Sequence, residues 1–298
     1  MNRREFLAVG AAGFAASVAR PAVPGRWQLG FSLYGMKALK LADALSACAK
    51  IGYDGVELAL MPGYAADPKM LVPDDRRDLR KRLGDSGLSL LGLMENLIEP
   101  SVEAIRKSNL EKLKAAAELG NELSPKTPPA IETILGGKPA DWEKVKGPLF
   151  EKLQAWAKVA VAHKTVIAIK PHVSNALHTP DAALELVKQI DSPWIRLAFD
   201  HSHFALQGLK LSETLPKLLP LTSFVHIKDA KGKPDKFEFL LPGDGDTDYA
   251  DYFARLTKAD YAGPVVVEVS GQISNKSGYD PVMAAKRCFA NLAKVRGN

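Results

Sequence analysis

Short hydrophobic runs alternate along the chain with longer stretches in which hydrophobic positions recur every three or four residues. The first pattern is typical of buried strands and the second of amphipathic helices. Eight strands are predicted, over residues 27–33, 54–59, 88–93, 130–135, 165–169, 195–199, 223–227 and 264–269. Helices are predicted between and after the strands, over residues 41–51, 74–85, 102–119, 148–162, 180–190, 211–218, 249–256 and 281–295.

This alternation predicts an α/β fold. Near-continuous hydrophobic strands joined by helices form parallel sheets that helices cover. Eight strand–helix units in a row fit a closed (β/α)8 TIM barrel better than an open sheet. No glycine-rich turn of the GxGxxG or GxxxxGK[ST] type follows a strand, which counts against a nucleotide-binding fold. We expect one barrel domain over residues 27–298 and no second domain.

The N-terminal residues have the pattern of an export signal. Arg3 and Arg4 precede a weakly hydrophobic run over residues 8–19, which holds no lysine or arginine and ends in small residues suited to signal peptidase. Paired arginines followed by such a run resemble a twin-arginine (Tat) signal peptide. We expect the signal over residues 1–19, a linker over residues 20–26, and a mature protein in the periplasm or outside the cell. A disordered basic tail is the alternative.

Composition and charge narrow the class of protein. The 298 residues are 46% hydrophobic and 25% charged, which is typical of a globular domain. The net charge of +6 is small, and the arginines over residues 74–85 are mixed with aspartates, so nucleic acid is not an expected partner. No segment after the signal has the apolar length of a stable membrane anchor. Cys48 and Cys288 are expected as buried free thiols, with a disulfide between them as the alternative.

Polar residues gather where the predicted strands end. The C-terminal ends of barrel strands, with the loops that follow, form the active face of this fold. Residues at or just after those ends are Glu57, Glu95, Asn96, Lys170, His172, Asp200, His201, His203, His226, Lys228, Asp229 and Glu268. Four of the six histidines of the chain are among them, and such convergence on one face favours a functional site over scattered structural histidines.

Asp200, His226 and Glu268 are the candidate metal ligands. Two carboxylates and one imidazole suit a divalent metal such as Mn, Co, Zn, Fe or Mg rather than a metal that prefers thiolates. Three protein ligands would leave coordination positions open for water and substrate oxygens. The alternative is a hydrogen-bonded ion network without a metal.

Five short motifs together resemble a known family. They are GYDGVE over residues 52–57, DHSH over 200–203, VHIKD over 225–229, LPGDGD over 241–246 and VE over 267–268. In this order they are similar to the sugar phosphate isomerase/epimerase superfamily, the xylose isomerase-like TIM barrels, and the likeness extends from about residue 27 to the end. That superfamily includes ketose 3-epimerases, hydroxypyruvate isomerase, inosose dehydratase and, distantly, endonuclease IV.

The resemblance implies a ligand set as well as a fold. In the isomerases and epimerases of the superfamily, a glutamate on strand five, an aspartate on strand six, a histidine on strand seven and a glutamate on strand eight bind a metal. The two glutamates also act as the acid/base pair. The last three positions match Asp200, His226 and Glu268, and His203 matches a histidine that contacts substrate oxygens. The strand-five position holds Lys170 instead of the expected glutamate.

Lys170 leaves three interpretations open. First, the three matching ligands keep the metal, His172 assists them, and Lys170 acts as a general base or oxyanion partner with a pKa lowered by the ion. Second, the Lys170 ammonium group replaces the metal as the charge that stabilises an enolate, and no metal is needed. Third, the site binds a sugar without catalysis.

The leading hypothesis is an exported sugar isomerase or epimerase that acts next to a carbonyl group through a metal-stabilised enediolate. Glu268 would be a ligand and one acid/base, and Lys170 or His172 would supply the partner function. Substrate contacts are expected from His203, Glu57, Glu95 and Lys228. The closest alternative is a lyase or dehydratase on keto-sugars or keto-glycosides, because expelling a β group needs only one good base. A non-catalytic sugar-binding barrel is the third hypothesis; in each case the partner is a small carbohydrate, and an oligomer is compatible with the sequence.

Overall fold

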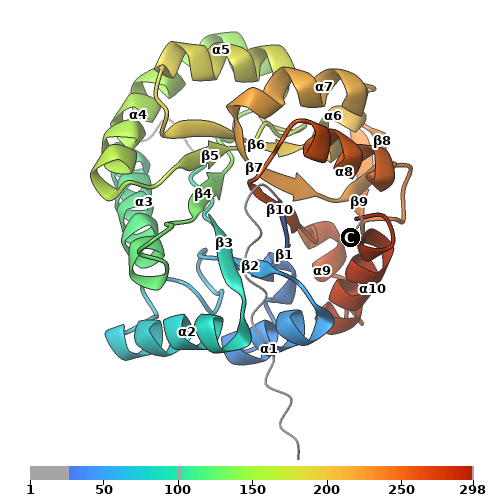
Figure 1. The fold of residues 1–298 in the computed structure, drawn as a ribbon. Coiled ribbons are helices and arrows are strands. Elements are labelled where there is room, and N and C mark those ends of the chain that lie inside the picture. The colour runs from blue at the N-terminus through green and yellow to red at the C-terminus, as the bar shows by residue number, and fades with distance from the viewer. Residues whose placement is uncertain (1–26, 99–102, 297–298) are drawn as a thin grey trace, which may run out of the picture.

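The computed structural model describes residues 27–98 and 103–296. Eight parallel strands close into a barrel and helices surround it, as Figure 1 shows. In order around the barrel the strands are β1 (Gln28–Ser32), β2 (Gly55–Ala59), β3 (Ser89–Met94), β4 (Ala130–Thr133), β5 (Ile167–Ile169), β6 (Ile195–Asp200), β7 (Thr222–Ile227) and β10 (Pro264–Val267). The predicted (β/α)8 TIM barrel is confirmed, whereas the predicted signal peptide and linker lie outside the described residues.

The helices follow the strands along the chain. The longer ones are α1 (Leu41–Ile51), α2 (Pro73–Ser86), α3 (Glu103–Leu123), α4 (Trp142–His163), α5 (Pro180–Ile190), α7 (Leu211–Leu218), α8 (Tyr249–Lys258) and α10 (Pro281–Ala293). Shorter helical segments are α6 (His201–Ala205), α9 (Gly271–Ser274) and the 3-10 turns Leu33–Met36, Pro139–Asp141 and Leu219–Leu221. Helix α6 begins directly after β6, and α9 begins four residues after the end of β10, so both belong to the loops of the C-terminal face.

Two elements differ from the predicted pattern. Helix α4 begins at Trp142 rather than at Pro148, because the Trp142 indole is buried and donates to Glu185 of α5 at 3.2 Å. An antiparallel hairpin of β8 (Asp229–Lys233) and β9 (Lys236–Leu240) follows β7. The hairpin was not predicted because its lysine-rich residues lack the hydrophobic run of a buried strand.

The pleat of the strands decides which residues face the inside of the barrel. Successive side chains of a strand point to opposite faces. A buried hydrophobic cluster inside the barrel consists of Leu91, Ala168, Ala198, Phe224 and Val266. Two positions further along four of these strands come Lys170, Asp200, His226 and Glu268. The charged residues therefore form a layer at the C-terminal face, directly above a hydrophobic layer.

A larger hydrophobic core fills the space between the barrel and its helices. Trp27, Trp142 and Trp156 are buried in this core and pack there. Cys48 and Cys288 are buried free thiols, as predicted. Within the described part of the chain, no helix combines the length and hydrophobicity that crossing a membrane requires.

Gly92 of β3 tests the packing beneath the charged layer. A methyl group at Gly92 would lie 2.5 Å from Phe224 Cε2, inside a barrel whose side chains have little room to move. We expect Gly92→Ala to lower the free energy of unfolding, measured by urea titration, by about 1–3 kcal/mol. Gly84→Ala in α2 is the control: nothing lies within 4 Å of its added methyl group, and alanine should stabilise that helix by about 0.5–1 kcal/mol. Equal effects of the two changes would contradict a tightly packed interior.

Candidate active site

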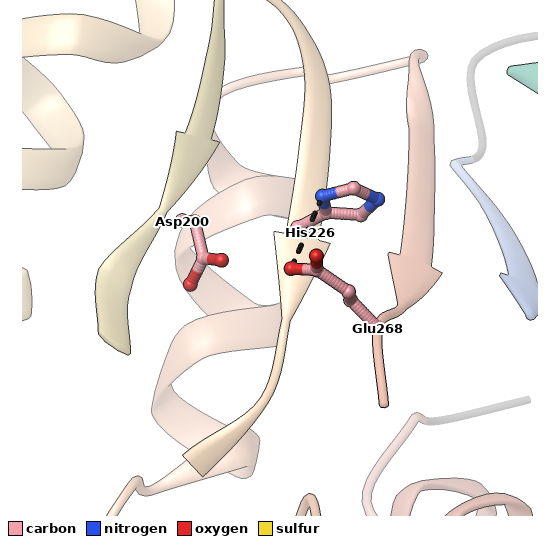
Figure 2. Close-up of side chains that lie close together, drawn as sticks. All are labelled: Asp200, His226 and Glu268. Atoms are coloured by element: carbon pink, nitrogen blue, oxygen red, sulfur yellow. Dashed lines mark ion pairs between the residues drawn. The ribbon is translucent and has the colours of Figure 1, made fainter. Parts of the chain in front are cut away.

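Asp200, His226 and Glu268 meet at the C-terminal face of the barrel (Figure 2). They lie on or directly after β6, β7 and β10, which are neighbouring strands. One ligand-type atom from each residue lies within 4.8 Å of the others, and His226 Nδ1 is 3.6 Å from Glu268 Oε2. The structure thus brings together the three residues predicted as metal ligands.

The ammonium group of Lys170 lies among these side chains. Lys170 directly follows β5 and is buried. Its Nζ donates to the carboxylate oxygens of Glu268 at 3.2 and 3.3 Å and lies 3.1 Å from Glu132 Oε1. It also lies 3.1 Å from His226 Nδ1. The residue at the position of the expected glutamate therefore bridges two carboxyl groups and the histidine.

A second ammonium group, that of Lys228, also contacts Glu268. Lys228 directly follows β7 and is buried. Its Nζ donates to Asp200 Oδ2 and, at 2.5 Å, to Glu268 Oε2. Asp200 Oδ1 accepts hydrogen bonds from the backbone N–H and the hydroxyl of Ser202, at 3.1 and 2.7 Å. Both oxygens of Asp200 are therefore engaged, one by Lys228 and one as the N-cap of α6.

Hydrogen bonding fixes the tautomer of His226. An ammonium group can only donate, so His226 Nδ1 accepts the hydrogen bond from Lys170. The ring proton then lies on Nε2, which is 3.0 Å from Glu57 Oε2. Glu57, on β2, is fully buried, and its carboxylate orients the imidazole ring.

The two ammonium groups set the charge state of the carboxyl groups. Burial alone raises the pKa of Glu268, but Lys170 and Lys228 outweigh it and hold that pKa well below its ordinary value. Burial lowers the pKa of Lys170, yet the surrounding carboxyl groups, first Glu132 and then Glu268, raise it above its ordinary value. Burial raises the pKa of Glu132, which Lys170 offsets only in part. Glu268 is therefore an anion and Lys170 a cation, while Glu132 keeps its proton to higher pH than an ordinary glutamate.

A cavity of about 130 Å³ adjoins this ion network. Its charged lining residues are Glu132, Lys170, Lys228 and Glu268, and its wall includes Tyr34, His172, His203 and Phe239. Charged groups, imidazoles and aromatic rings around one small space suit a polyhydroxylated molecule, which offers both polar hydroxyls and apolar ring faces.

His172 and His203 form a contacting pair on the cavity wall, with ring centroids 4.1 Å apart. Burial, together with the nearby positive charges, lowers the pKa of His172 to about 4 and that of His203 well below its ordinary value. Backbone N–H groups donate to Nδ1 of each ring, from Ser174 to His172 and from Val173 to His203. Each ring proton therefore lies on Nε2, so both residues are neutral hydrogen-bond donors. His203 Nε2 is buried and lies 3.5 Å from Asp200 Oδ2.

The motifs VHIKD and LPGDGD meet through Asp229. Its Oδ2 accepts hydrogen bonds from the backbone N–H groups of Gly243 and Gly245, at 2.7 and 2.9 Å. Its Oδ1 accepts one from the Tyr249 hydroxyl at 3.3 Å. Gly243 has a φ of 88°, a conformation that favours glycine. Asp229 therefore holds the loop after β9 against the end of β7.

A divalent ion does not fit the charge of this arrangement, although Asp200, His226 and Glu268 have the grouping of a metal site. Lys228 binds Asp200 and Glu268. Lys170 binds Glu268 and occupies the Nδ1 lone pair of His226. An ion among these atoms would lie beside two buried positive charges, whose repulsion the protein interior screens poorly.

The other predicted site residues divide into two groups. Those that line the cavity are Lys170, His172, His203 and Lys228. Glu57 and Glu95 are not among the described residues that line it. Glu57 supports His226, and Glu95 lies 3.4 Å from Lys112 of α3. Both glutamates contact other side chains in this structure, and their predicted role in substrate contact stays a prediction.

Sequence reasoning missed Glu132. It lies in β4 and pairs in register with Ala168 of β5, whose side chain faces the inside of the barrel. The available signal was a carboxyl group within a hydrophobic run, because a buried strand tolerates such a group only where a partner is near. That partner, Lys170, could be identified only once the strands were placed side by side.

Residues 45–286 match the family model of the xylose isomerase-like TIM barrels. An inosose dehydratase of Geobacillus kaustophilus is 22% identical over 282 residues, which cover 85% of this chain and 84% of that protein. The 3-keto-D-glucoside 4-epimerase YcjR from E. coli has a TM-score of 0.71 at 18% identity, covering 90% of this chain and 100% of that one. The IOLI protein with a bound zinc atom has a TM-score of 0.72 at 18% identity, covering 90% and 99%. The two solved structures share the barrel fold with this chain.

Lys170→Met tests how strongly the buried ion network stabilises the fold. The change removes one of the two ammonium partners of Glu268 and the cation beside Glu132. We expect the free energy of unfolding in urea to fall by about 3 kcal/mol, at the lower end for breaking a buried ion pair, because Lys228 still binds Glu268.

Lys231→Met is the matched control for that measurement. Lys231 pairs with Glu238 on the exposed hairpin, where both side chains are more than half exposed. Such a pair contributes less than about 1 kcal/mol. A loss no larger in Lys170→Met than in Lys231→Met would contradict a stabilising role for the buried network.

Proposed function

The chain belongs to the xylose isomerase-like TIM barrel family, and we propose that it is a lyase that acts on a small keto-sugar or keto-glycoside. In this proposal the enzyme removes the proton next to the carbonyl group and expels the oxygen substituent on the neighbouring carbon. The observation that carries the proposal is the state of Glu268, a carboxylate that lines the cavity while Lys170 and Lys228 hold it ionised. It combines a general base with cations at the place where negative charge would develop.

The first step of the proposed reaction makes an enolate. Glu268 accepts the α proton, and the electron pair of the broken C–H bond forms a C–C double bond. The carbonyl oxygen becomes an enolate oxygen, which the ammonium group of Lys170 or Lys228 stabilises by a charge-assisted hydrogen bond. His172 and His203, as neutral donors on the wall, orient the hydroxyl groups of the substrate.

The second step breaks the bond to the β oxygen. As the carbonyl group re-forms, the electron pair moves into the α,β bond and the β oxygen leaves with a proton. Glu132 is the candidate donor of that proton, because it lines the cavity and its raised pKa keeps the proton available. The products are an unsaturated ketone and water, or an alcohol when the substrate is a glycoside.

The positions of the two carboxyl groups support this division of roles. β4, which carries Glu132, lies on the opposite side of the barrel from β10, which Glu268 follows. Their carboxyl groups approach the same ammonium group of Lys170, at 3.1 and 3.2 Å. An acid and a base at two sides of one small cavity are what elimination of a protonated leaving group requires.

An epimerase or isomerase is the second candidate, and the opposed positions of Glu132 and Glu268 favour it. If no group leaves, Glu132 can return a proton to the face of the enolate opposite Glu268. Similar proteins include a dehydratase of inosose and a 4-epimerase of a 3-keto-glucoside. The lyase has priority because Lys170 and Lys228 hold only Glu268 strongly ionised, whereas a reversible two-base shuttle needs each carboxyl group to act as a base.

Export bears on the choice of substrate. We propose that residues 1–19 direct the protein through the twin-arginine route to the periplasm or beyond, on the basis of their sequence pattern. Sugar phosphates belong mostly to the cytoplasm. An exported enzyme with this site is therefore expected to act on unphosphorylated keto-sugars or keto-glycosides.

An inosose and a 3-keto-glucoside are the first substrates to test, in D₂O with NMR and ultraviolet detection. A lyase produces an unsaturated ketone that absorbs in the ultraviolet. An epimerase instead produces a new diastereomer that carries deuterium at the α carbon. Saturable sugar binding without either product and without deuterium exchange would contradict both enzymatic proposals and favour a sugar-binding barrel.

Glu268→Gln should remove the general base. We expect kcat to fall by about 10²–10⁴-fold in steady-state assays with the substrate identified above, the usual effect of losing a positioned acid or base. Glu122→Gln, on the exposed face of α3, is the control and should leave kcat unchanged. A Glu268→Gln variant with wild-type kcat would rule out this residue as the base.

Glu132→Gln should change the pH profile of kcat as well as its size. In the wild type the rate falls at low pH as Glu268 gains a proton, and this limb lies below the ordinary glutamate range because the pKa of Glu268 is lowered. The rate falls at higher pH as Glu132 loses its proton. The glutamine variant is therefore expected to lose the alkaline limb and to keep the acidic one; an unchanged alkaline limb would assign it to another group.

A further inference from the structure

The ammonium groups of Lys170 and Lys228, here called the lysine pair, lie among the three residues that have the grouping of a metal site. We propose that the lysine pair replaces a divalent ion in this protein, and that Lys170 is the residue that keeps such an ion out. The proposal goes beyond the reaction proposed above, because it concerns what the site binds whichever product is made.

The contacts of the lysine pair are the contacts that an ion would need. Lys170 Nζ donates hydrogen bonds to Nδ1 of His226 and to both carboxylate oxygens of Glu268. Lys228 Nζ donates hydrogen bonds to Oδ2 of Asp200 and to Oε2 of Glu268. A metal ion binds through the lone pairs of these same atoms. The ion and the lysine pair therefore compete for one set of positions.

The charge of the site favours the lysine pair. The pair carries the positive charge of one divalent ion, divided between two points that each donate hydrogen bonds to carboxylates. Adding an ion would double the positive charge in a buried site, unless a lysine lost its proton. Lys170 Nζ lies 3.1 Å from Glu132 Oε1 and 3.3 and 3.2 Å from the two oxygens of Glu268, so neighbouring carboxyl groups stabilise the ammonium group in place.

The pairing of β5 keeps the ammonium group of Lys170 on the inward side of the barrel. The residue is 4% exposed, and its backbone N–H donates to Thr133 O at 2.8 Å, which continues the pairing of β4 with β5. It shares the inward face of β5 with Ala168. Turning outward would place the charge in the hydrophobic core between the barrel and its helices, at a large desolvation cost.

Lys170 is the decisive member of the pair. A glutamate at position 170 would free Nδ1 of His226 and supply a further carboxylate beside Glu268. It would also remove one positive charge, while Lys228 stays bound to Asp200. Oxygen donors with one imidazole then surround a space of net negative charge, which is the donor set that a divalent ion prefers.

The test compares metal retention by the wild type, Lys170→Glu and Lys170→Met. Each full-length protein, with any affinity tag removed, is treated with a chelator, incubated with MnCl₂ or ZnCl₂, desalted and subjected to elemental analysis. We expect only traces of metal in the wild type and near-stoichiometric metal in Lys170→Glu. Lys170→Met is the matched control, because it removes the ammonium group without supplying a ligand. If this variant also retains metal, the positive charge of Lys170 alone keeps the ion out, and the proposal is still supported.

Two outcomes would overturn the proposal. Near-stoichiometric metal in the wild type would show that the lysine pair does not exclude an ion. Metal-free protein in all three cases would show that Lys170 is not the residue that keeps the ion out.

Thermal unfolding of the wild type gives an independent measurement if a variant fails to fold. An ion that binds the native state raises Tm. The wild-type Tm is expected to be insensitive to chelator and to added Mn²⁺, whereas the Tm of a folded Lys170→Glu should rise with Mn²⁺. A wild-type Tm that falls with chelator would overturn the proposal. No readout requires a substrate, so failure of the lyase proposal would be distinguishable from failure of this one.

Discussion

The buried contact between the ammonium group of Lys170 and the carboxyl groups of Glu132 and Glu268 is the interaction on which the site depends. Charges persist in a protein interior only when they are paired. Here one cation is shared by two carboxyl groups from opposite sides of the barrel. A second cation, Lys228, reaches only Glu268 of the two. Glu268 therefore has two ammonium partners and is an anion, whereas Glu132 has one and is able to keep a proton. Two residues of the same type acquire different chemistry in this way.

The barrel makes this contact possible through the pleat of its strands. Ala168, Ala198 and Val266 form part of a small hydrophobic floor inside the barrel. The next inward positions of the same strands carry the charges of the site. Helices and a large hydrophobic core on the outside leave those charged side chains no other direction. The different surroundings of Glu132 and Glu268 therefore depend on the alternation of inward and outward side chains, which all strands of the barrel share.

Strand and helix positions could be predicted because they follow from local periodicity. The helices at Pro180–Ile190 and Leu211–Leu218 have the predicted bounds, and the convergence of Asp200, His226 and Glu268 followed from the rule that strand ends meet at one face. The partners of Lys170 could not be predicted, because Glu132 and Glu268 are distant from it in sequence and nothing local sets their distances. The hairpin β8–β9 was missed because β8 is mostly polar and the alternation of Phe237 and Phe239 in β9 covers only five residues.

Lys170 also has a genetic consequence. Lysine codons (AAA, AAG) and glutamate codons (GAA, GAG) differ at their first base alone, so one transition separates the two residues at position 170. On one side of that transition lies a barrel whose catalytic charge must be acquired from the surroundings as an ion. On the other side lies a barrel whose charge is supplied by a lysine side chain, so it is present as soon as the chain folds. If the protein is exported as proposed, a charge of the second kind would be present wherever metals are scarce or are held by competitors.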